Sequence, residues 1–285
     1  MDVDVDLRKL RYFVAVAERL HFGRAAEFLH IAQPALSRQI RALEHDLGVR
    51  LFDRDRHRVT LTPAGRQLLD DARPLLAAAA ATRRRVRRAG DGHRTFTVGF
   101  RAGIAVTAAV RAFAAEHPDV TVEPHQVEWD DQVEPLLNGR VEVAFLRPPV
   151  AEAGLTLVTL FTEPRVAALP VDHRLAGKGA VHRADLADEL FTWPAGAGTE
   201  ASRRTRTSAG IVVRTVEEKL EHIAAGRAVV LLPTSMAALY QRPDVVYVPL
   251  IDEPPEPVFL ATVAGPGSPL IDAFTRAARA TMAPA

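Results

Sequence analysis

The 285-residue sequence predicts an α+β chain of several domains, and three observations support this prediction. Residues 10–47 carry apolar side chains at three- and four-residue spacings, which is typical of amphipathic helices. Residues 62–89 keep a similar spacing in one stretch, which predicts a single long helix. From residue 95 onward, short apolar runs alternate with helical patterns, which predicts a parallel sheet covered by helices.

The first 47 residues predict three short helices. One apolar face of the first helix consists of Leu10, Phe13, Val14, Ala17 and Leu20. Gly23 is an acceptable N-cap for the second helix, and only residues 30–32 separate it from the third, so we expect a tight turn. Pro34 suits the first turn of the third helix, and Gly48 is a natural residue to end it.

The third helix has two contrasting faces. Its inward face is predicted to contain Leu36, Ile40, Leu43 and Leu47. Its outward side chains are those of Gln33, Ala35, Ser37, Arg38 and Arg41. Short, polar and cationic side chains at the start of such a helix suit the base edges and phosphates of DNA. The pair of short helices therefore predicts a helix-turn-helix that places this helix in the major groove.

A basic hairpin follows the helix-turn-helix. Residues 49–53 and 58–62 each alternate apolar and polar side chains, which indicates two short strands. The turn between them gathers Arg54, Arg56, His57 and Arg58. Such a run alone is usually a solvated loop, but beside a helix-turn-helix it predicts a wing that contacts the minor groove or the phosphate backbone.

The next helix is unusually long. Thr62 can cap it and Pro63 occupies its first position. Some 26 residues give a rod of roughly 39 Å. Its near-heptad stripe contains Leu68, Leu69, Ala72, Leu75, Leu76, Ala79, Thr82 and Val86. This stripe favours contact with a partner helix over packing on its own domain. Pro74 predicts a kink.

Charge and composition limit the function classes. Residues 1–92 carry 18 Lys and Arg against 12 Asp and Glu, whereas residues 93–285 carry 18 against 23. A basic amino-terminal part on an acidic body is typical of a DNA-binding domain joined to another domain. The absence of Cys excludes disulfides, thiol catalysis and thiolate metal sites. No apolar run approaches the ~18 residues of a membrane span, so we expect a soluble, cytoplasmic protein.

The second half predicts alternating strands and helices. The strands are expected at residues 96–100, 120–127, 141–146, 166–169 and 228–232. The helices are expected at residues 104–116, 130–138, 216–225 and 268–282, the last with Ser268 as its N-cap. Residues 191–216 are rich in Gly, Ser and Thr and predict a loop.

Residues 7–65 resemble the winged helix-turn-helix of LysR-type transcriptional regulators. The motifs that carry the resemblance are Leu-Arg-Tyr-Phe, Phe-Gly-Arg-Ala-Ala, Gln-Pro-Ala-Leu-Ser-Arg-Gln-Ile, Leu-Gly-Val-Arg-Leu-Phe and Leu-Thr-Pro-Ala-Gly. The resemblance implies a homodimer built on the linker helix, or a dimer of dimers, on an interrupted palindromic operator. The predicted DNA-binding residues are Gln33, Pro34, Ala35, Ser37, Arg38, Arg41, Arg54, Arg56, His57 and Arg58.

The second half is similar to the effector-binding region of the same family. The matching phrases are Phe-Thr-Val-Gly-Phe, Asn-Gly-Arg-Val-Glu-Val-Ala-Phe-Leu-Arg-Pro-Pro, Ala-Leu-Pro-Val-Asp-His-Arg-Leu-Ala and Ala-Ala-Gly-Arg-Ala-Val-Val-Leu-Leu-Pro. This likeness implies the two-lobed fold of periplasmic binding proteins. The predicted domains are residues 1–62 for DNA binding, 63–92 for the linker and 93–285 for the effector. Within the last, lobe I is 94–160 with 263–285, and lobe II is 161–262. Relative to the family, the 191–216 segment is short, so lobe II is expected to lack a helix.

A ligand cleft is predicted between the lobes, because ligands of open α/β sheets bind beyond the carboxyl ends of the strands. The predicted effector-binding residues are Arg101, Ala102, Gly103, Glu128, Trp129, Leu146, Arg147, Trp193, Pro194 and Thr199. Arg101 and Arg147 offer paired donors suited to a carboxylate. The alternative for Arg101 and Arg147 is that each forms a surface ion pair. The alternative for Trp129 and Trp193 is that each packs in the hydrophobic core.

The sequence therefore predicts a DNA-binding regulator whose DNA binding or bending responds to a small carboxylate or aromatic effector, with RNA polymerase as a further partner. The alternative is the same regulator without a ligand. An enzyme is disfavoured, because no serine lies in a nucleophile elbow and the ten histidines lack paired metal-ligand spacing. A solute-binding protein has no use for a wing. No cofactor or metal is predicted.

Overall fold

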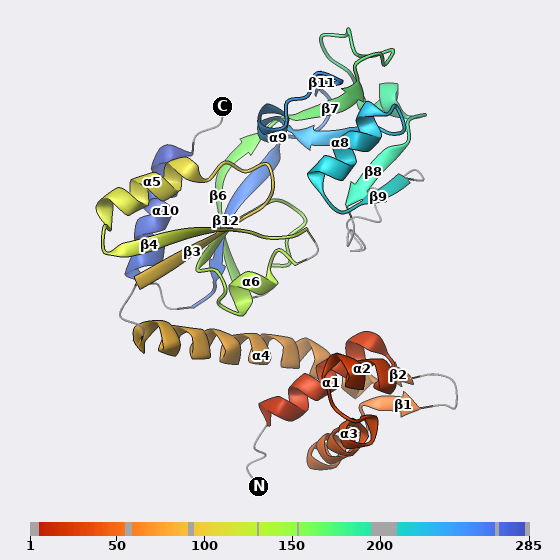
Figure 1. Cartoon of the computed structure of the whole chain (residues 1–285), viewed down its shortest axis with the longest axis vertical. Helices are drawn as coiled ribbons and strands as arrows, with labels where there is room; N and C mark the ends of the chain where they lie inside the picture. The colour runs from red at the N-terminus through yellow and green to blue at the C-terminus, as the bar shows by residue number, and fades with distance from the viewer. Residues whose placement is uncertain are drawn as a thin grey trace. The chain divides into compact units, whose positions relative to one another are not determined.

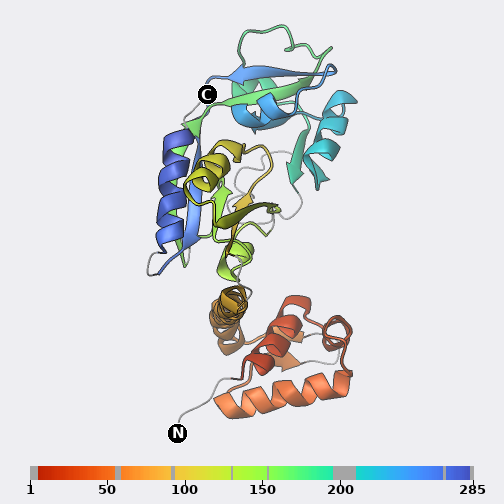
Figure 2. The same cartoon turned by 60° about the vertical axis from the view of Figure 1, so that its left-hand side comes forward.

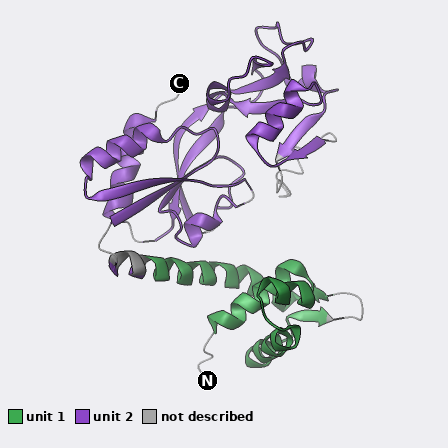
Figure 3. Cartoon of the chain, in the orientation of Figure 1, with its two compact units in different colours: residues 1–85 green, residues 86–285 purple. Residues whose placement is uncertain are grey.

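The computed structural model describes residues 6–54, 59–90, 94–129, 131–152, 154–194, 210–265 and 268–282. Its chain forms two compact units, residues 1–85 and 86–285 (Figure 3). Among the described residues, no helix has both the length and the apolar character needed to cross a membrane.

The first unit contains the predicted three helices, hairpin and long helix (Figure 1). The elements are α1 (Leu7–Arg19), α2 (Phe22–Phe28), α3 (Gln33–Leu47), β1 (Phe52–Arg54), β2 (Val59–Leu61) and α4 (Pro63–Gly90). Phe13 of α1 is fully buried, and its ring centroid lies 5.4 Å from that of Phe52 in β1. Phe22 of α2 contacts the same ring edge-on at 5.8 Å. These aromatic contacts place the hairpin against the helices.

The ends of α2 and α3 test the predicted caps. Gly23 was predicted to cap α2, and this is wrong, because Gly23 lies inside the helix. His21 is the N-cap, and its ring Nδ1 accepts a hydrogen bond from the Arg24 N–H at 3.1 Å. A ring nitrogen thus accepts the capping hydrogen bond that the oxygen of a short side chain usually accepts. Gly48 ends α3 as predicted, with a left-handed φ of 68°.

Two sets of hydrogen bonds join the hairpin to the helices around it. The Glu44 carboxylate on α3 accepts from the N–H groups of Leu51 and Phe52, at 2.9 and 3.3 Å. Thr62 caps α4 as predicted, because its Oγ1 accepts from the Gly65 N–H at 2.9 Å. The Thr62 hydroxyl also donates to the Arg50 carbonyl at 2.7 Å. The hairpin is therefore fixed to both α3 and α4.

The first half of α4 packs on its own domain. Leu68 and Leu69 pack against the helix-turn-helix core, and Ala72 is fully buried. Arg73 adds an exposed ion pair with Glu18 of α1 at 3.1 Å. The helix continues through Pro74 without interruption. The first half of α4 therefore packs on its own domain, which was the less favoured of the two predictions.

The second unit contains a five-stranded sheet with the order β4-β3-β5-β12-β6. Its strands are β3 (Arg94–Phe100), β4 (Val120–Gln126), β5 (Val143–Leu146), β6 (Leu155–Glu163) and β12 (Glu256–Val263). β3 runs parallel to β4 and β5, as predicted. β12 runs antiparallel to both of its neighbours, so the prediction of a parallel sheet does not hold for this strand.

Helices cover both faces of this sheet. The helices are α5 (Thr107–Glu116), α6 (Glu134–Leu137) and α10 (Pro269–Thr281). Val143 and Phe145 of β5 pack with α5 and α10, which lie side by side in Figure 1 and Figure 2. Ala144 and Leu146 pack on the opposite face with Leu136 of α6. The predicted helix over residues 130–138 is thus reduced to a single turn among the described residues.

The remaining elements form the second lobe. They are β7 (Arg165–Pro170), a 3-10 helix (Arg183–Leu186), β8 (Phe191–Pro194), β9 (Gly210–Val213), α8 (Val216–Ala224), β10 (Val230–Pro233), α9 (Thr234–Leu239) and β11 (Val245–Leu250). β7 pairs antiparallel with β10 and β11, and β8 pairs in parallel with β9. The chain between β8 and β9 lies outside the described residues, so the expected absence of a helix there stays a prediction.

The lobe boundaries differ from the predicted ones. Residues 161–262 were assigned to lobe II, but β12 pairs with β5 inside the lobe I sheet. β6 and β12 are paired along their whole lengths, from Glu163 opposite Glu256 to Leu155 opposite Val263. They therefore form the two strands that lead from one lobe to the other.

Gly65→Ala is expected to destabilise the first unit. A Cβ at this position would lie 2.1 Å from the Leu51 carbonyl oxygen, and a backbone atom cannot move aside cheaply. Overpacking of this kind costs about 1–3 kcal/mol or more. Urea denaturation followed by circular dichroism will measure the loss. Both tryptophans lie in the second unit, so the transition seen by tryptophan fluorescence should not move.

Gly90→Ala is the matched control on the same helix. An added Cβ there meets nothing within 4 Å, and alanine favours helix by up to about 1 kcal/mol. Equal behaviour of the two variants would contradict the close contact at Gly65.

Candidate functional site

The outward face of α3 carries the predicted DNA-contacting side chains. Leu36 and Ile40 are fully buried beneath it. The residues exposed on it are Gln33, Pro34, Arg38 and Arg41, with Ala35 and Ser37 half-buried beside them. Within the described parts of the chain, neither arginine forms an ion pair. Two cations with no ion-pair partner in that part of the chain therefore stand on one face of α3.

The turn before α3 fixes where this face points. His30 adopts a left-handed φ of 53°, and the Ile31 N–H bonds to the Ala26 carbonyl at 3.0 Å. Ala25 and Ala26 of α2 are buried. Such small side chains let α2 and α3 approach closely. The tight turn was predicted from its length, and His is one of the few residue types other than Gly that are enriched at positive φ.

The hairpin supplies only part of the predicted wing. β1 and β2 pair from Phe52 opposite Leu61 to Arg54 opposite Val59. Arg54 stands at the tip end of β1. The other predicted wing residues, Arg56, His57 and Arg58, lie outside the described residues, and their DNA contacts stay predictions.

In the second unit, Arg101 follows β3 and is 6% exposed. Its guanidinium donates to Gln132 Oε1 at 3.0 Å and lies 4.0 Å from the Trp129 ring centroid. Gln132 in turn donates to the Pro149 carbonyl. The structure thus brings Arg101 and Trp129 together, as the predicted cleft requires, while Glu128 beside them is exposed.

Arg101 is a buried cation. Burial lowers its pKa to about 10 and repulsion from Arg147 acts in the same direction, while attraction by Glu256 and Glu128 acts in the opposite direction. The group stays protonated at neutral pH, and it has no ion-pair partner among the residues described. A buried cation without a counter-charge is costly, so this arrangement favours an anion.

Lys219 on α8 is a further cation that sequence reasoning missed. Burial lowers its pKa to about 8, and repulsion from Arg101 contributes. Val216, Leu220 and Ile223 form the buried stripe of this helix, and Lys219 borders it. A Lys that borders an apolar stripe is usually a solvated flank, so only the fold reveals its proximity to Arg101.

Arg147 differs from the predicted ligand-binding role. Its guanidinium donates to the Glu163 carboxylate at 2.7 Å, and both side chains are nearly buried, at 5% and 6% exposure. It also donates to Ser235 Oγ at 2.7 Å and to the Gly103 carbonyl at 3.2 Å. The carboxylate that Arg147 binds in this structure thus belongs to the protein, and its contacts join the two lobes.

The loop before α5 meets lobe II directly. Ala102 packs against the cluster formed by α8, α9 and their strands. Gly103 has a φ of 81°, and a Cβ there would lie 2.8 Å from Met236. Glycine is therefore required at this contact for both conformation and space. Both residues lie at the predicted junction of the lobes.

Several other predicted cleft residues serve the core. Leu146 is fully buried between the sheet and α6. Trp193 stacks on Phe191 at 5.9 Å within the lobe II core. Pro194 ends β8, and Thr199 lies outside the described residues, so its contact stays a prediction.

Comparisons with known proteins agree with this division of the chain. A family model described as the LysR substrate binding domain matches residues 89–283. One described as a bacterial regulatory helix-turn-helix protein of the lysR family matches residues 7–66. Together these two matches span almost the whole sequence.

Individual relatives cover different shares of the chain. The Hca operon transcriptional activator HcaR of Escherichia coli is 40% identical over 185 residues, 64% of this chain and 62% of that protein. The uncharacterized regulator YnfL of Escherichia coli is 40% identical over 196 residues, 67% of this chain and 66% of that protein. This chain therefore matches just under two thirds of the length of these two relatives. The regulator BenM of Acinetobacter baylyi is 30% identical over 274 residues, 90% of each chain.

Solved structures match along nearly the whole chain. The crystal structure of CbnR, a LysR family transcriptional regulator, has a TM-score of 0.62 and 28% identity, and covers 97% of this chain and 99% of that one. Full-length CbnR complexed with its target DNA gives a TM-score of 0.60 and 29% identity, and covers 98% and 100%. The similarity thus extends over both units.

Arg147→Met is expected to destabilise the second unit by about 3–5 kcal/mol, because it leaves the Glu163 carboxylate buried without its partner. Urea denaturation followed by tryptophan fluorescence will measure the loss. Adding Glu163→Gln should recover part of it, because the uncompensated charge is then removed.

Arg94→Met is the control for this ion pair. Arg94 pairs with Asp119 at 2.7 Å, but both side chains are more than half exposed, so the cost should be at most about 1 kcal/mol. A loss of that size for Arg147→Met would show that the buried network does not hold the lobes.

Proposed function

Because the chain belongs to the LysR family of DNA-binding transcriptional regulators, we propose that it reads an interrupted palindromic operator through α3 and alters its grip when a small effector binds between the lobes. The observation that carries the DNA-binding part is the face of α3, where exposed Arg38 and Arg41 lack protein counter-charges within the described residues. Such cations are available to base edges and phosphates.

The reading helix is held as a DNA-binding helix needs to be. Leu36 and Ile40 anchor its inner face in the core, and Glu44 ties its end to the hairpin. Gln33, Ser37 and Arg38 lie in its first two turns, the part that meets base edges in helix-turn-helix proteins. The hairpin then lies in reach of the adjacent backbone. The complex of CbnR with its target DNA supports this use of the fold.

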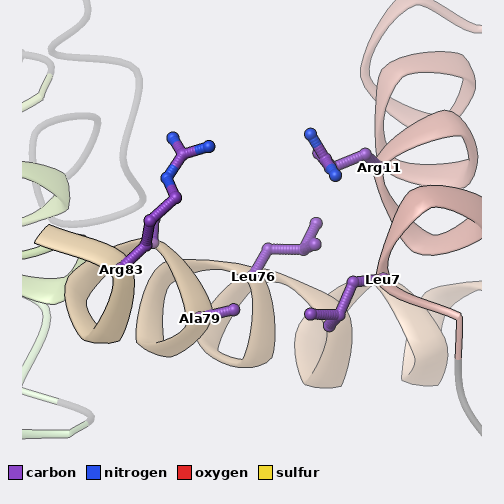
Figure 4. Close-up of a pocket in the computed structure, with 6 residues that line it drawn as sticks. Leu7, Arg11, Leu76, Ala79 and Arg83 are labelled. Carbon is purple, nitrogen blue, oxygen red and sulfur yellow. The ribbon is translucent and has the colours of Figure 1, made fainter. Parts of the chain in front are cut away.

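A homodimer is proposed through α4. Leu75 and Val86 on this helix are 51% and 68% exposed. A groove of about 250 Å³ also runs between α1 and α4 (Figure 4). Its lining residues are Leu7, Arg11, Leu76, Ala79, Ala80 and Arg83. An apolar floor with basic rims suits a second amphipathic helix. A second copy of the chain is the proposed occupant, and two dimers form the larger assembly.

The effector is proposed to bind where Arg101 and Trp129 meet. Arg101 is buried and cationic, and the aromatic ring covers one side of its guanidinium. An anion there would contact a loop that also packs on lobe II. A ligand that binds one lobe arrangement better shifts the population toward it. The shift would alter how the paired DNA-binding domains are spaced, and hence the bend of the DNA. RNA polymerase would respond to that change.

Arg38→Ala is expected to weaken operator binding by about 1–3 kcal/mol and to relax the preference at the base it contacts. Fluorescence anisotropy with operator variants at fixed salt will measure both effects. Arg276→Ala, an exposed arginine on α10, is the control and should bind normally. Unchanged base discrimination in Arg38→Ala would exclude a base contact by this residue.

Leu76→Glu is expected to shift the protein from dimer toward monomer, because it puts a charge on the floor of the α1–α4 groove. Sedimentation velocity over a range of concentrations will measure the shift. Leu239→Glu, at an exposed leucine of the second unit, should leave the dimer intact. A Leu76→Glu dimer of normal strength would exclude this groove as the interface.

A further inference from the structure

We propose that His21, besides capping α2, contacts DNA directly: its imidazole Nε2–H donates to a backbone phosphate next to the base edge that Gln33 is proposed to contact. This inference rests on the proposed reading of DNA through α3, and it adds a residue that the sequence did not indicate. A phosphate contact carries no base preference of its own, but it fixes the register of the protein on the duplex.

The capping hydrogen bond determines the chemistry of the His21 ring. Its Nδ1 accepts from the Arg24 N–H at 3.1 Å, so the neutral ring carries its proton on Nε2. The side chain is exposed, and within the part of the chain that the structure describes Nε2 has no hydrogen-bond partner. One ring nitrogen is thus engaged within the protein, and the other is a donor available to a group outside it.

Gly23 allows the ring to lie next to the reading helix. A Cβ on Gly23 would lie 3.0 Å from His21 Cε1 and 3.5 Å from Gln33 Oε1. The side chains of His21 and Gln33 therefore reach the same point on the surface of α2, although one precedes α2 and the other begins α3. Cε1 is bonded to Nε2 in the imidazole ring, so the available donor lies close to the Gln33 amide.

The place of His21 in the fold favours a phosphate over a base edge. In helix-turn-helix proteins the helix before the reading helix crosses the DNA backbone, while the first residues of the reading helix meet base edges. His21 belongs to the former helix and Gln33 to the latter. Arg24, one turn along α2, is exposed and forms no ion pair among the described residues, so its charge favours an anion there. His21 and Gln33 thus suit neighbouring parts of one DNA strand.

His21→Ser separates the two roles of the side chain, because serine caps a helix well but is too short to take the place of Nε2. The probe is a duplex that the full-length protein selects from a random-sequence library. The melting temperature of the variant is expected to equal that of the wild type. Its affinity for the selected duplex should fall by about tenfold, the loss of one hydrogen bond to a charged group. Single-base variants of the duplex should lose affinity by the same factor.

His125→Ser is the matched control for the loss of a histidine. His125 is exposed on β4 of the second unit, so this variant should bind the selected duplex normally.

Methylphosphonate substitution locates the contact. One phosphate of the selected duplex is replaced at a time, which removes its charge and one acceptor oxygen. At one position the replacement is expected to weaken binding by the wild type but not by His21→Ser, because the variant has already lost that contact.

Gly23→Ala tests the same contact without changing His21. The added Cβ pushes the ring aside, whereas alanine favours the helix. This variant should bind the duplex more weakly without losing stability, and it should cause no further loss in the His21→Ser background. If His21→Ser also lowers the melting temperature, Gly23→Ala decides, and normal binding by Gly23→Ala then overturns the inference.

The outcomes separate this inference from the proposed function. Normal affinity of His21→Ser would make His21 a helix cap only and would overturn the phosphate contact. A loss confined to one base identity would overturn it as well, because it would assign His21 to a base edge. In both cases reading through α3 stands, provided that Arg38→Ala changes base discrimination. Unchanged discrimination in Arg38→Ala together with a tenfold loss in His21→Ser would instead overturn the reading role of Arg38 and leave the phosphate contact.

Discussion

The buried ion pair between Arg147 and Glu163 is the interaction on which the two-lobed half of the molecule depends. Arg147 comes from the end of β5, and Glu163 from the end of the crossover strand β6. Ser235 on α9 completes the network, since its N–H donates to the other oxygen of the Glu163 carboxylate at 2.8 Å. Its hydroxyl also bonds to the Gly103 carbonyl at 3.0 Å. Arg147, Glu163, Ser235 and Gly103 are thus joined in one network that spans both lobes and the hinge.

This network distinguishes Arg147 from Arg101, the arginine proposed to bind the effector. Two arginines follow adjacent parallel strands, and of these two only Arg147 forms an ion pair among the described residues. Arg147 forms this ion pair with Glu163. Arg101 instead donates a hydrogen bond to the neutral amide of Gln132 and lies over the aromatic ring of Trp129. Under the proposed function, Arg147 stabilises the junction of the lobes and Arg101 is the arginine that would bind the effector. Nearby, burial raises the pKa of Glu256.

The elements with local signals were predictable from the sequence. Pro34 and Gly48 mark the ends of α3, and Thr62 marks the start of α4, because caps depend on residues next to one another. Residues 256–262, which form most of β12, were assigned to lobe II although they pair in the lobe I sheet, because their partner β5 lies more than a hundred residues earlier and pairing over that distance leaves no local pattern. His21 was overlooked as a cap, since its ring acts in a role usually filled by Ser, Thr, Asp or Asn.

The candidate sites divide in the same way. The outward face of α3 follows from helical periodicity alone, so its exposed residues were predictable. The cleft was predicted from strand ends, which gave no means of distinguishing Arg101 from Arg147. Lys219 was missed, because its neighbourhood exists only after α8 packs against a loop that lies far away in the chain.

The contact between Gly65 and the Leu51 carbonyl limits the insertions that α4 can accept. It fixes the rotation of α4 about its own axis relative to the reading helix, and each further residue turns a helix by about 100°. One residue inserted between Gly65 and Leu76 would swing the groove residues round to another side of the rod, while α3 stayed where it was. Three or four inserted residues would nearly restore the original direction. The length of α4 between Gly65 and Leu76 therefore sets the direction of the groove relative to α3. Insertions or deletions there keep that direction only when they add or remove whole helical turns.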